Sequence, residues 1–324
     1  MDVVSLGDLV IDFTPVGFSG KGNVLYEKNP GGAPANVAVT VARLGGKAAF
    51  LGAIGDDNFG RFLKGEMLKH GVDVSALQFV NTGCTKFSFV SLDENNDRSF
   101  YFPPIPLAEI HYRIDDDSID LVTGSKIFML STVSQYRKPI CTAAEEFLRI
   151  AVEKGVKVAY DPNWNIAFST DRKAEKNIII NTIKRSNIVK LSLDEVKFVY
   201  DTDDYAYVAK AIYEEGVELA AISLGSHGCY YHYKGGKGFI SAYKIQAKDT
   251  TGAGDAFLGG MLYALTRNGR NNIAGISKAE MDTIIMFAQA CGAVCASKMG
   301  AMPSVESMDE IYDFQKRMRD FKVI

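Results

Sequence analysis

The stretch Asp249-Thr250-Thr251-Gly252-Ala253-Gly254-Asp255-Ala256-Phe257 places two carboxylates around two threonines and a Gly-Ala-Gly turn. Apolar residues continue from Ala256 at helical spacing, so the turn is predicted to lead directly into a helix. Glycines just ahead of a helix let successive backbone N–H groups point toward one spot, and the positive end of the helix dipole adds to their field. The stretch therefore predicts a cradle for an anion such as a phosphoryl group.

Asp255 lies in the first turn of this predicted helix, where the pKa of a carboxyl group tends to fall. A carboxylate would repel a phosphate group that was only bound there. It can instead take the proton of a hydroxyl group that attacks a phosphoryl group held by the N–H groups of residues 253–255. Asp255, Gly252, Ala253 and Gly254 are thus the predicted catalytic residues, and the alternative is a helix N-terminus without chemistry.

Two separate stretches of the chain carry a family resemblance. Asp-Thr-x-Gly-Ala-Gly-Asp-x-Phe resembles the C-terminal signature of the ribokinase-type (PfkB) carbohydrate kinases. Gly31-Gly32-Ala33-Pro34-Ala35-Asn36-Val37-Ala38 resembles their N-terminal signature. The resemblance runs over nearly the whole chain, and it implies an ATP-dependent kinase that phosphorylates a sugar hydroxyl group.

Composition limits the other classes of function. The chain has 324 residues, 47% of them hydrophobic, which suits one large α/β domain with or without a small appendage. Its net charge of −3 and its lack of a basic block disfavour nucleic acid and membrane surfaces as partners. The N-terminus does not resemble a signal peptide, and no apolar run is expected to span a bilayer. A cytoplasmic protein is predicted.

Cysteine and histidine usage gives no sign of a metal site or a disulfide framework. The five cysteines are odd in number and scattered, which indicates a reducing compartment, and the four histidines are dispersed as well. A zinc site is not expected. The cysteines are Cys84, Cys141, Cys229, Cys291 and Cys295.

Strand and helix patterns alternate along the chain. This alternation predicts the α/β class, a mostly parallel sheet covered by helices on both faces. By resemblance the fold is a three-layer α/β/α arrangement of the ribokinase-like type. Strands are expected at 3–7, 48–52, 126–130, 157–160, 188–190 and 219–223, and helices include 57–70, 138–154 and 206–215.

A small second sheet is predicted from β-rich sequence on both sides of the turn at 94–97 and from an early hairpin. The family uses such a sheet as a lid over the sugar and often as a dimer contact. A lid would exclude water, which competes as a phosphoryl acceptor. The expected domains are a core of 1–12, 31–81 and 113–324 and a discontinuous lid of 13–30 and 82–112, with a homodimer formed through the lid.

Several residues are expected to bind the sugar. Asp12 follows the first strand and matches the family position that binds sugar hydroxyl groups, although alone it could be a solvated turn residue. Paired glycines let the backbone approach a ligand closely, and Asn36 offers both a donor and an acceptor, although this stretch alone reads as a capped start of a helix. The predicted substrate-binding residues are Asp12, Gly31, Gly32, Asn36, Arg98, Phe102 and Asn163.

By resemblance, ATP lies along later strand ends. Lys190-Leu191-Ser192-Leu193-Asp194-Glu195 resembles the family's Asn-x-x-Glu segment, in which Glu195 would place Mg²⁺ through water; the alternative is an acidic helix start. Ser223-Leu224-Gly225-Ser226-His227-Gly228 resembles a loop along the nucleotide, or else is a tight turn. The predicted ATP-binding residues are Lys190, Ser192, Glu195, Ser223, Gly225, Gly228 and Gln289, the last facing adenine.

A monovalent cation, commonly K⁺, lies beneath the anion cradle in many family members. Such an ion could hold the cradle in its productive shape. The expected ligands in this chain are Asp249, Thr251 and backbone carbonyl groups near Ala296 and Ala301.

The sugar itself is less well defined. Segments 98–100, 161–163 and 190–192 favour fructokinase, but the chain has Phe102-Pro103-Pro104 where fructokinases commonly read Phe-Tyr-Arg, and Asn165 where many have arginine. Without those arginines an acidic sugar such as 2-keto-3-deoxygluconate is disfavoured, because its carboxylate would be bound best by a bidentate donor such as arginine. Ribokinase and nucleoside kinase activities stay open. A catalytically silent sugar-binding regulator is the alternative from another class, and the lack of a GxGxxG motif disfavours a dinucleotide oxidoreductase.

Overall fold

A long sheet crosses the whole molecule in the computed structural model, which describes residues 1–92, 98–166, 169, 171–267, 272–304 and 307–320. The nine strands lie in the order β13-β12-β11-β10-β9-β8-β1-β4-β5. Neighbours from β11 to β5 are parallel, and β12 and β13 add an antiparallel hairpin at one edge. The strands are β1 (Val3–Leu6), β4 (Ala48–Gly55), β5 (Leu77–Val80), β8 (Ile127–Leu130), β9 (Lys157–Tyr160), β10 (Ile188–Ser192), β11 (Leu219–Ser223), β12 (Gly228–Tyr233) and β13 (Gly236–Ser241).

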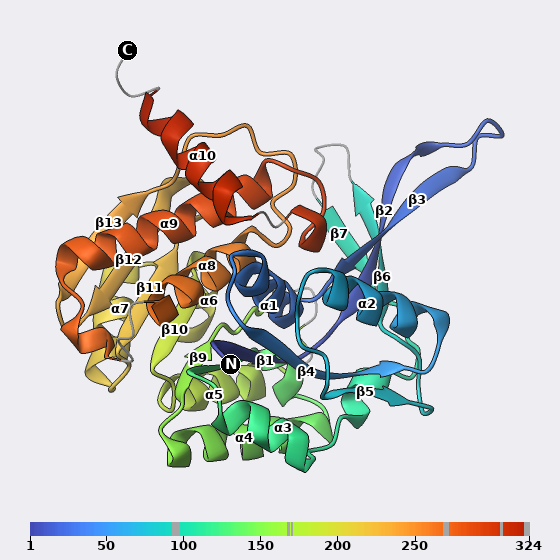
Figure 1. Cartoon of the computed structure of the whole chain (residues 1–324), viewed down its shortest axis with the longest axis horizontal. Coiled ribbons are helices and arrows are strands. Elements are labelled where there is room, and N and C mark those ends of the chain that lie inside the picture. The colour runs from blue at the N-terminus through green and yellow to red at the C-terminus, as the bar shows by residue number, and fades with distance from the viewer. Residues whose placement is uncertain (93–97, 167–168, 170, 268–271, 305–306, 321–324) are drawn as a thin grey trace.

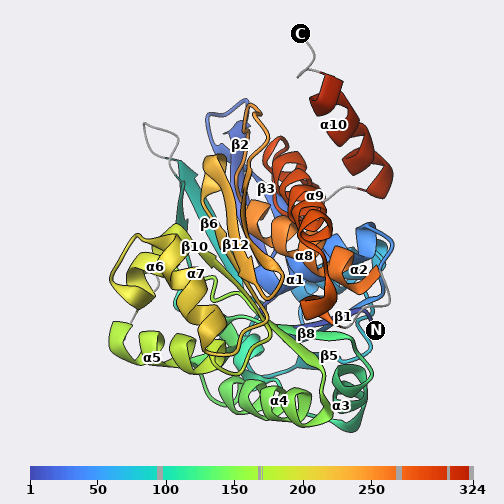
Figure 2. The ribbon, with the colours of Figure 1, turned by 90° about the vertical axis from the view of Figure 1, so that its left-hand side faces the viewer.

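Helices cover both faces of this sheet, so the predicted three-layer α/β/α fold is confirmed (Figures 1 and 2). One layer contains α1 (Ala33–Arg43), α2 (Asn58–Lys69), α8 (Ala253–Arg267) and α9 (Lys278–Ala296), with α10 (Met308–Asp320) packed on α9. The other contains α3 (Asp116–Thr123), α4 (Ile140–Lys154), α5 (Arg172–Ile183), α6 (Leu193–Tyr200) and α7 (Tyr205–Glu214).

Alternation along the strands fills a separate hydrophobic core on each face. Val3 of β1 packs in the core under α1 and α8, whereas Val4 points into the core under α4 and α7. On β8, Met129 packs in the same core as Val3, and Phe128 packs in the same core as Val4. A strand buried on both faces reads as a continuous apolar run, which is why these strands could be predicted from the sequence.

A second, four-stranded sheet projects from the body (Figure 1). Its strands lie in the order β3-β2-β6-β7 and are β2 (Val10–Phe18), β3 (Val24–Gly31), β6 (Phe87–Leu92) and β7 (Arg98–Tyr101). The small sheet was predicted, but β2 begins at Val10, before the expected boundary at residue 13. Asp12 is therefore on a strand of the small sheet. The predicted turn at 94–97 lies outside the described residues.

Two glycines let α8 pack closely between its neighbouring helices. A Cβ added at Gly259 would lie 2.5 Å from Cβ of Thr40 on α1. One added at Gly260 would lie 2.7 Å from Sγ of Cys291 on α9. Because real Cβ atoms are never that close to such neighbours, larger side chains would push α8 away from α1 or α9. This packing fixes the start of α8, where Asp255 lies.

Helix α9 departs from one expectation. It has the length and the mean hydropathy (1.2) of a membrane-crossing helix, although no such run was expected from the sequence. Most of that window is buried inside the protein, against α8 and α10. Within the described chain, α9 is thus a core helix whose length and composition resemble those of a membrane-crossing helix.

Candidate active site

A cavity of about 790 Å³ lies between the small sheet and the carboxyl ends of the central strands. Ligands of open α/β sheets bind at these strand ends. The cavity is lined by ten of the residues predicted from the sequence, which come from six separate stretches of the chain. They are Asp12, Gly32, Asn36, Phe102, Asn163, Lys190, Thr251, Gly252, Gly254 and Asp255.

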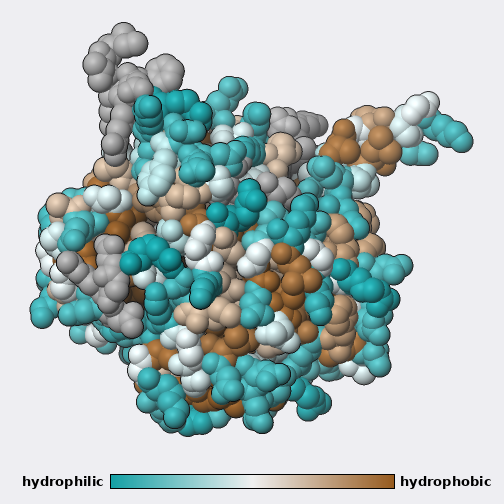
Figure 3. All heavy atoms as spheres, in the orientation of Figure 1, coloured by the Kyte–Doolittle hydropathy of each residue, from teal (hydrophilic) through white to brown (hydrophobic). Residues whose placement is uncertain are grey.

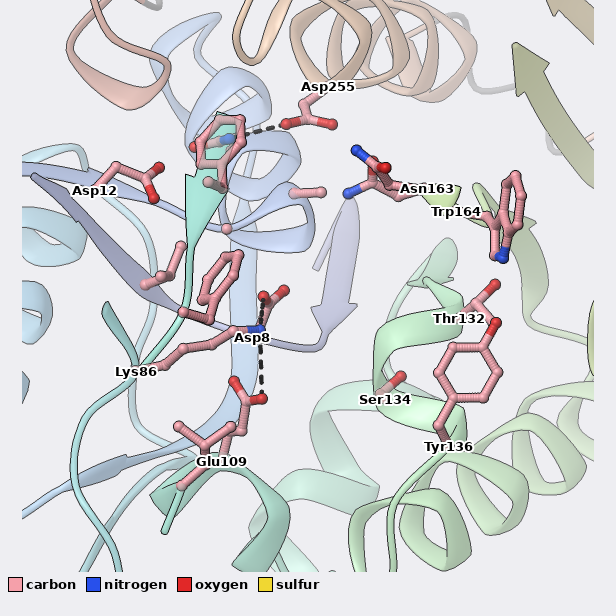
Figure 4. A pocket seen from close by; sticks show the side chains of 18 of the residues that line it. Asp8, Asp12, Lys86, Glu109, Thr132, Ser134, Tyr136, Asn163, Trp164 and Asp255 are labelled. Atoms are coloured by element: carbon pink, nitrogen blue, oxygen red, sulfur yellow. Dashed lines mark hydrogen bonds and ion pairs between the residues drawn. The ribbon is translucent and has the colours of Figure 1, made fainter. Parts of the chain in front are cut away.

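Asp255 is held in place by a residue from the other signature. Asn36 Nδ2 on α1 donates a hydrogen bond to Asp255 Oδ2 on α8 at 2.8 Å, across 219 positions of sequence (Figure 4). Asn36 is nearly fully buried, whereas Asp255 is partly open to the cavity. Asn36 was expected to bind sugar; in the structure its side chain orients the carboxylate of Asp255.

The pKa of Asp255 moves opposite to the sequence-based expectation. The pKa of Asp255 is raised to about 7, mainly by burial and in addition by the negative charges of Asp161 and Asp8. The hydrogen bond from Asn36 and the charge of Lys190 oppose this shift. Position in the first turn of a helix was expected to lower the pKa, but loss of solvation outweighs that effect. A carboxyl group with a pKa near 7 is well matched to accept a proton at neutral pH.

The anion cradle is narrower than predicted. Ala253 N–H donates to the carbonyl group of Thr250 at 3.2 Å, so it does not face a ligand, contrary to the prediction. Gly254 and Asp255 follow in the first turn of α8, where a helix offers no internal acceptor. In the described chain, the N–H groups of Gly254 and Asp255 donate to no backbone carbonyl group. They are the donors left for a phosphoryl group.

Gly252 makes the sharp turn before this cradle. Its φ of +77° belongs to the left-handed region that favours glycine. A Cβ at this position would also lie 2.6 Å from Cβ of Ala301. Both the conformation and the close contact therefore require glycine.

Lys190 adds a positive charge beside the cradle. A Cβ added at Gly254 would lie 3.3 Å from Lys190 Nζ, so the ammonium group lies next to the start of α8. Nζ forms a buried ion pair with Asp161 Oδ2 at 2.9 Å. Burial alone would lower the pKa of Lys190, but the charges of Asp161 and Glu195 outweigh it and keep the lysine protonated.

The small sheet contributes Asp12 to the lining of the cavity. Asp12 Oδ1 accepts a hydrogen bond from Ser88 Oγ at 2.5 Å, between neighbouring strands β2 and β6. A Cβ at Gly31 would lie 2.9 Å from Asp12 Oδ2, and one at Gly32 would lie 2.4 Å from the carbonyl oxygen of Asp8. The paired glycines therefore allow this close approach of chain segments. The side chain of Arg98 lies outside the described part of the structure.

Some of the predicted nucleotide residues come together, but not all of them face open space. Ser192 at the end of β10 pairs in register with Ser223 at the end of β11, and Gly225 and Gly228 follow. Gln289, expected to face adenine, is nine-tenths buried and donates to the Ile240 carbonyl group at 3.3 Å. This internal bond removes support for a direct contact with adenine.

Glu195 caps the start of helix α6, which was the alternative to its predicted role at Mg²⁺. Its Oε2 accepts from Ser192 N–H at 2.6 Å, and its Oε1 accepts from Trp164 N–H at 2.9 Å. Glu195 is buried and does not line the cavity. Burial and the charge of Asp161 raise its pKa to about 6, against the effect of Lys190. The geometry therefore shows a capping box that also fixes Trp164.

The expected ligands of a monovalent cation lie close together. Asp249 accepts from Thr251 N–H at 2.9 Å and from Gly300 N–H at 2.8 Å. Cys295 Sγ lies 3.6 Å from the Thr251 carbonyl oxygen and 4.0 Å from that of Ala301, so both carbonyl groups face one spot. The Ala296 carbonyl oxygen already accepts two N–H groups, from residues 248 and 249, which removes support for it as a ligand.

The cavity also contains charged residues that were not predicted. Asp8, Lys86 and Glu109 line it as a group, and Trp164 and Tyr136 lie on the facing wall (Figure 4). Asp8 could have been found, since it follows the first strand as closely as a ligand-binding carboxylate should. Lys86 and Glu109 carry no local signal in the sequence.

The Asp255 carboxyl group, with a pKa near 7, and the Lys190 ammonium group line the cavity together with Gly254. The N–H groups of Gly254 and Asp255 have no backbone acceptor among the described residues. Such an arrangement defines a phosphotransferase with an alcohol group as acceptor: the N–H groups and the lysine stabilise the transferred phosphoryl group, while the carboxylate removes a proton from the alcohol.

The comparisons agree with this class. Residues 1–308 match the pfkB family of carbohydrate kinases, and the chain belongs to this family. Fructokinase-1 of Oryza sativa subsp. japonica is 35% identical over 312 residues, covering 95% of this chain and 96% of that protein. The enzyme therefore transfers a phosphoryl group to a sugar hydroxyl group.

Solved structures are similar over the same length. Fructokinase with bound ATP from Xylella fastidiosa has a TM-score of 0.88 and 26% identity, and the match covers 98% of this chain and 99% of that one. Fructokinase from Vibrio cholerae O395 in its fructose, ADP and calcium ion bound form has a TM-score of 0.81 and 27% identity, with coverage of 97% and 98%.

Proposed function

We propose that the enzyme is a fructokinase, which transfers the γ-phosphoryl group of ATP to fructose and yields fructose 6-phosphate and ADP. The observation that carries this proposal is Asp255, oriented by Asn36 beside the N–H groups of residues 254 and 255. The similarity to named fructokinases supports fructose as the acceptor.

Fructose would lie between the small sheet and Asp255. Asp12, Gly31, Gly32, Asn36, Phe102 and Asn163 are its proposed contacts, with Arg98 as a further candidate on β7. Asp255 takes the proton of the hydroxyl group, and the new oxygen–phosphorus bond forms as the bond to ADP breaks. The N–H groups of Gly254 and Asp255 and the ammonium group of Lys190 stabilise the charge on the transferred phosphoryl group.

The nucleotide would extend over the ends of β10 and β11. Ser192, Ser223, Gly225 and Gly228 lie there, and Gln289 could contribute only after it releases Ile240. Among the described residues, no group of three or more His, Cys, Asp or Glu side chains is placed to hold a metal ion. Mg²⁺ would therefore arrive on the phosphates of ATP, with Glu195 acting through water at most.

A K⁺ ion would fit the carbonyl groups of Thr251 and Ala301 together with Asp249. This site lies directly beneath Gly252, whose turn shapes the anion cradle. The ion would supply a fixed positive charge there. Cys295 lies at the same place, so its thiol would have to move aside.

The small sheet is the proposed lid and dimer contact. Exposed apolar side chains gather on the ribbon of β2 and β3 where it projects from the body, among them Val16, Leu25 and Phe18, the last 73% exposed (Figure 3). Such a patch favours a protein partner, and a second copy of this chain fits it best because the family often pairs its lids. The five cysteines are free thiols, which suits the cytoplasm.

A panel of acceptors tests the proposed function. Fructose, ribose, 2-keto-3-deoxygluconate and nucleosides are each supplied with ATP and Mg²⁺, with and without K⁺, and ADP release is measured. We expect fructose to give the highest kcat/KM, no turnover without Mg²⁺ and a loss of rate without K⁺. A higher kcat/KM with ribose or a nucleoside would reassign the substrate, and sugar binding without turnover would indicate a regulator.

The raised pKa of Asp255 predicts the pH profile. A protonated carboxyl group cannot accept the substrate proton, so kcat/KM should fall below pH 7, by about tenfold for each pH unit, and level off above it. Rates at saturating ATP and low fructose from about pH 5.5 to 8.5 would measure this limb. A flat profile over that range would exclude Asp255 as the base.

A further inference from the structure

Three charged side chains form a closed group at the base of the small sheet. Lys86 Nζ lies 2.8 Å from Asp8 Oδ2 and 3.4 Å from Glu109 Oε1 (Figure 4). Asp8 and Glu109 are more than nine-tenths buried, at 8% and 7% exposure. We call Asp8, Lys86 and Glu109 the junction triad.

The junction triad belongs to the same cavity as Asp255. Asp8 lies between β1 and β2, Lys86 directly precedes β6, and Glu109 lies in a short 3-10 helix (Ala108–His111). All three line the cavity, and Figure 4 shows Asp255 on one side of it and Glu109 on the other. The triad is therefore positioned to contact the part of a bound sugar that lies away from the base.

The hydrogen bonds of the triad are incomplete within the described chain. Asp8 Oδ1 and Glu109 Oε2 are buried and accept no hydrogen bond, and the same is true of Asn36 Oδ1 nearby. Lys86 uses two of its N–H groups on the carboxylates, and its ammonium group lies 5.3 Å from the ring of Phe102. A buried acceptor without a donor costs free energy, so a ligand that donates hydrogen bonds to these oxygen atoms would be stabilised here.

The charge around the triad indicates which kind of group would donate these hydrogen bonds. The charged side chains that line the cavity are five acids and three bases, a formal net charge of −2: Asp8, Asp12, Glu109, Glu175 and Asp255 against Lys86, Arg137 and Lys190. A sugar carboxylate brought here would meet like charge, and Lys86 is already paired twice. Hydroxyl groups supply the missing donors without adding charge.

We infer that the junction triad is a specificity-determining subsite, which binds hydroxyl groups of a neutral sugar remote from the reacting one and disfavours sugar acids. This inference rests on the proposed function and deepens it. It assigns to Asp8, Lys86 and Glu109 the discrimination between neutral and acidic acceptors.

The test is Glu109→Gln, which removes one negative charge and leaves the Asp8–Lys86 pair intact. Titration calorimetry without nucleotide compares the affinities for fructose and 2-keto-3-deoxygluconate, so the result does not depend on turnover. The affinity ratio should shift toward the acid by about tenfold, with a matching shift in the kcat/KM ratio. Glu27→Gln, an exposed glutamate on β3 outside the cavity, is the matched control and should leave the ratio unchanged.

A companion variant guards against a folding defect. Asp8→Asn leaves the Lys86–Glu109 pair and should shift the ratio in the same direction. An affinity ratio within about twofold of the wild type in a folded variant of either kind would overturn the inference. If the wild type phosphorylates no sugar but the ratio still shifts, the proposed function fails and the subsite stands.

Discussion

Asp255→Asn should lower kcat at least ~10²-fold while the KM for ATP changes little. Asparagine keeps the shape and can still bond Asn36, but it cannot take a proton from the acceptor hydroxyl group. The two N–H groups of the cradle stay in place, so nucleotide binding should persist. Steady-state ADP release with fructose and with ATP varied in turn gives both constants.

The same substitution should stabilise the fold. The folded-state pKa of Asp255, about 7, lies above its ordinary value of 3.8 because of burial. The folded state therefore holds the proton more tightly, and stability is lost as the pH rises from the lower value through the higher one. Asparagine removes this loss, so thermal unfolding at pH 8 should show a gain on the order of 1–2 kcal/mol, with a smaller gain at pH 5.

A matched control separates charge at a helix start from charge in the cavity. Asp116 is an exposed aspartate in the first turn of α3. Asp116→Asn should leave kcat unchanged and should not stabilise the protein, since an exposed acid there helps its helix. Turnover near the wild-type rate in Asp255→Asn would remove this residue from the mechanism.

The central strands and the meeting of the two signatures could be predicted because each has a local signal. Apolar runs mark strands buried on both faces, and glycine-rich turns mark helix starts. Asn36 and Asp255 lie near the starts of the helices that follow such turns, and the fold brings Asn36 Nδ2 to 2.8 Å from Asp255 Oδ2. The family resemblance predicted that the two signatures belong to one site. The residues alone predicted only the starts of two helices.

What could not be predicted depends on surroundings that local sequence does not encode. The pKa of Asp255 rises because distant segments bury it, whereas the local rule for a helix start points the other way. Glu195 and Gln289 matched ligand positions by resemblance, yet the structure pairs them with Trp164 and Ile240. Lys86 and Glu109 become a unit only when the small sheet folds onto the core.

Lys190→Met should have the largest effect on stability. Lys190 and Asp161 form an ion pair at 2.9 Å and are both almost completely buried. Removing one partner leaves an uncompensated buried charge, so the free energy of unfolding should fall by about 3–5 kcal/mol. Activity should fall as well, because the ammonium group beside Gly254 no longer faces the phosphoryl group.

The double variant Lys190→Met/Asp161→Asn separates these two roles of Lys190. It removes both charges, so denaturant unfolding should recover most of the lost stability. The rate should not recover, since methionine cannot stabilise charge on the transferred phosphoryl group, and kcat/KM should stay ~10²-fold below the wild type. Recovery of the rate together with stability would mean that Lys190 only balances Asp161, and the phosphoryl group would then depend on the N–H groups of the cradle alone.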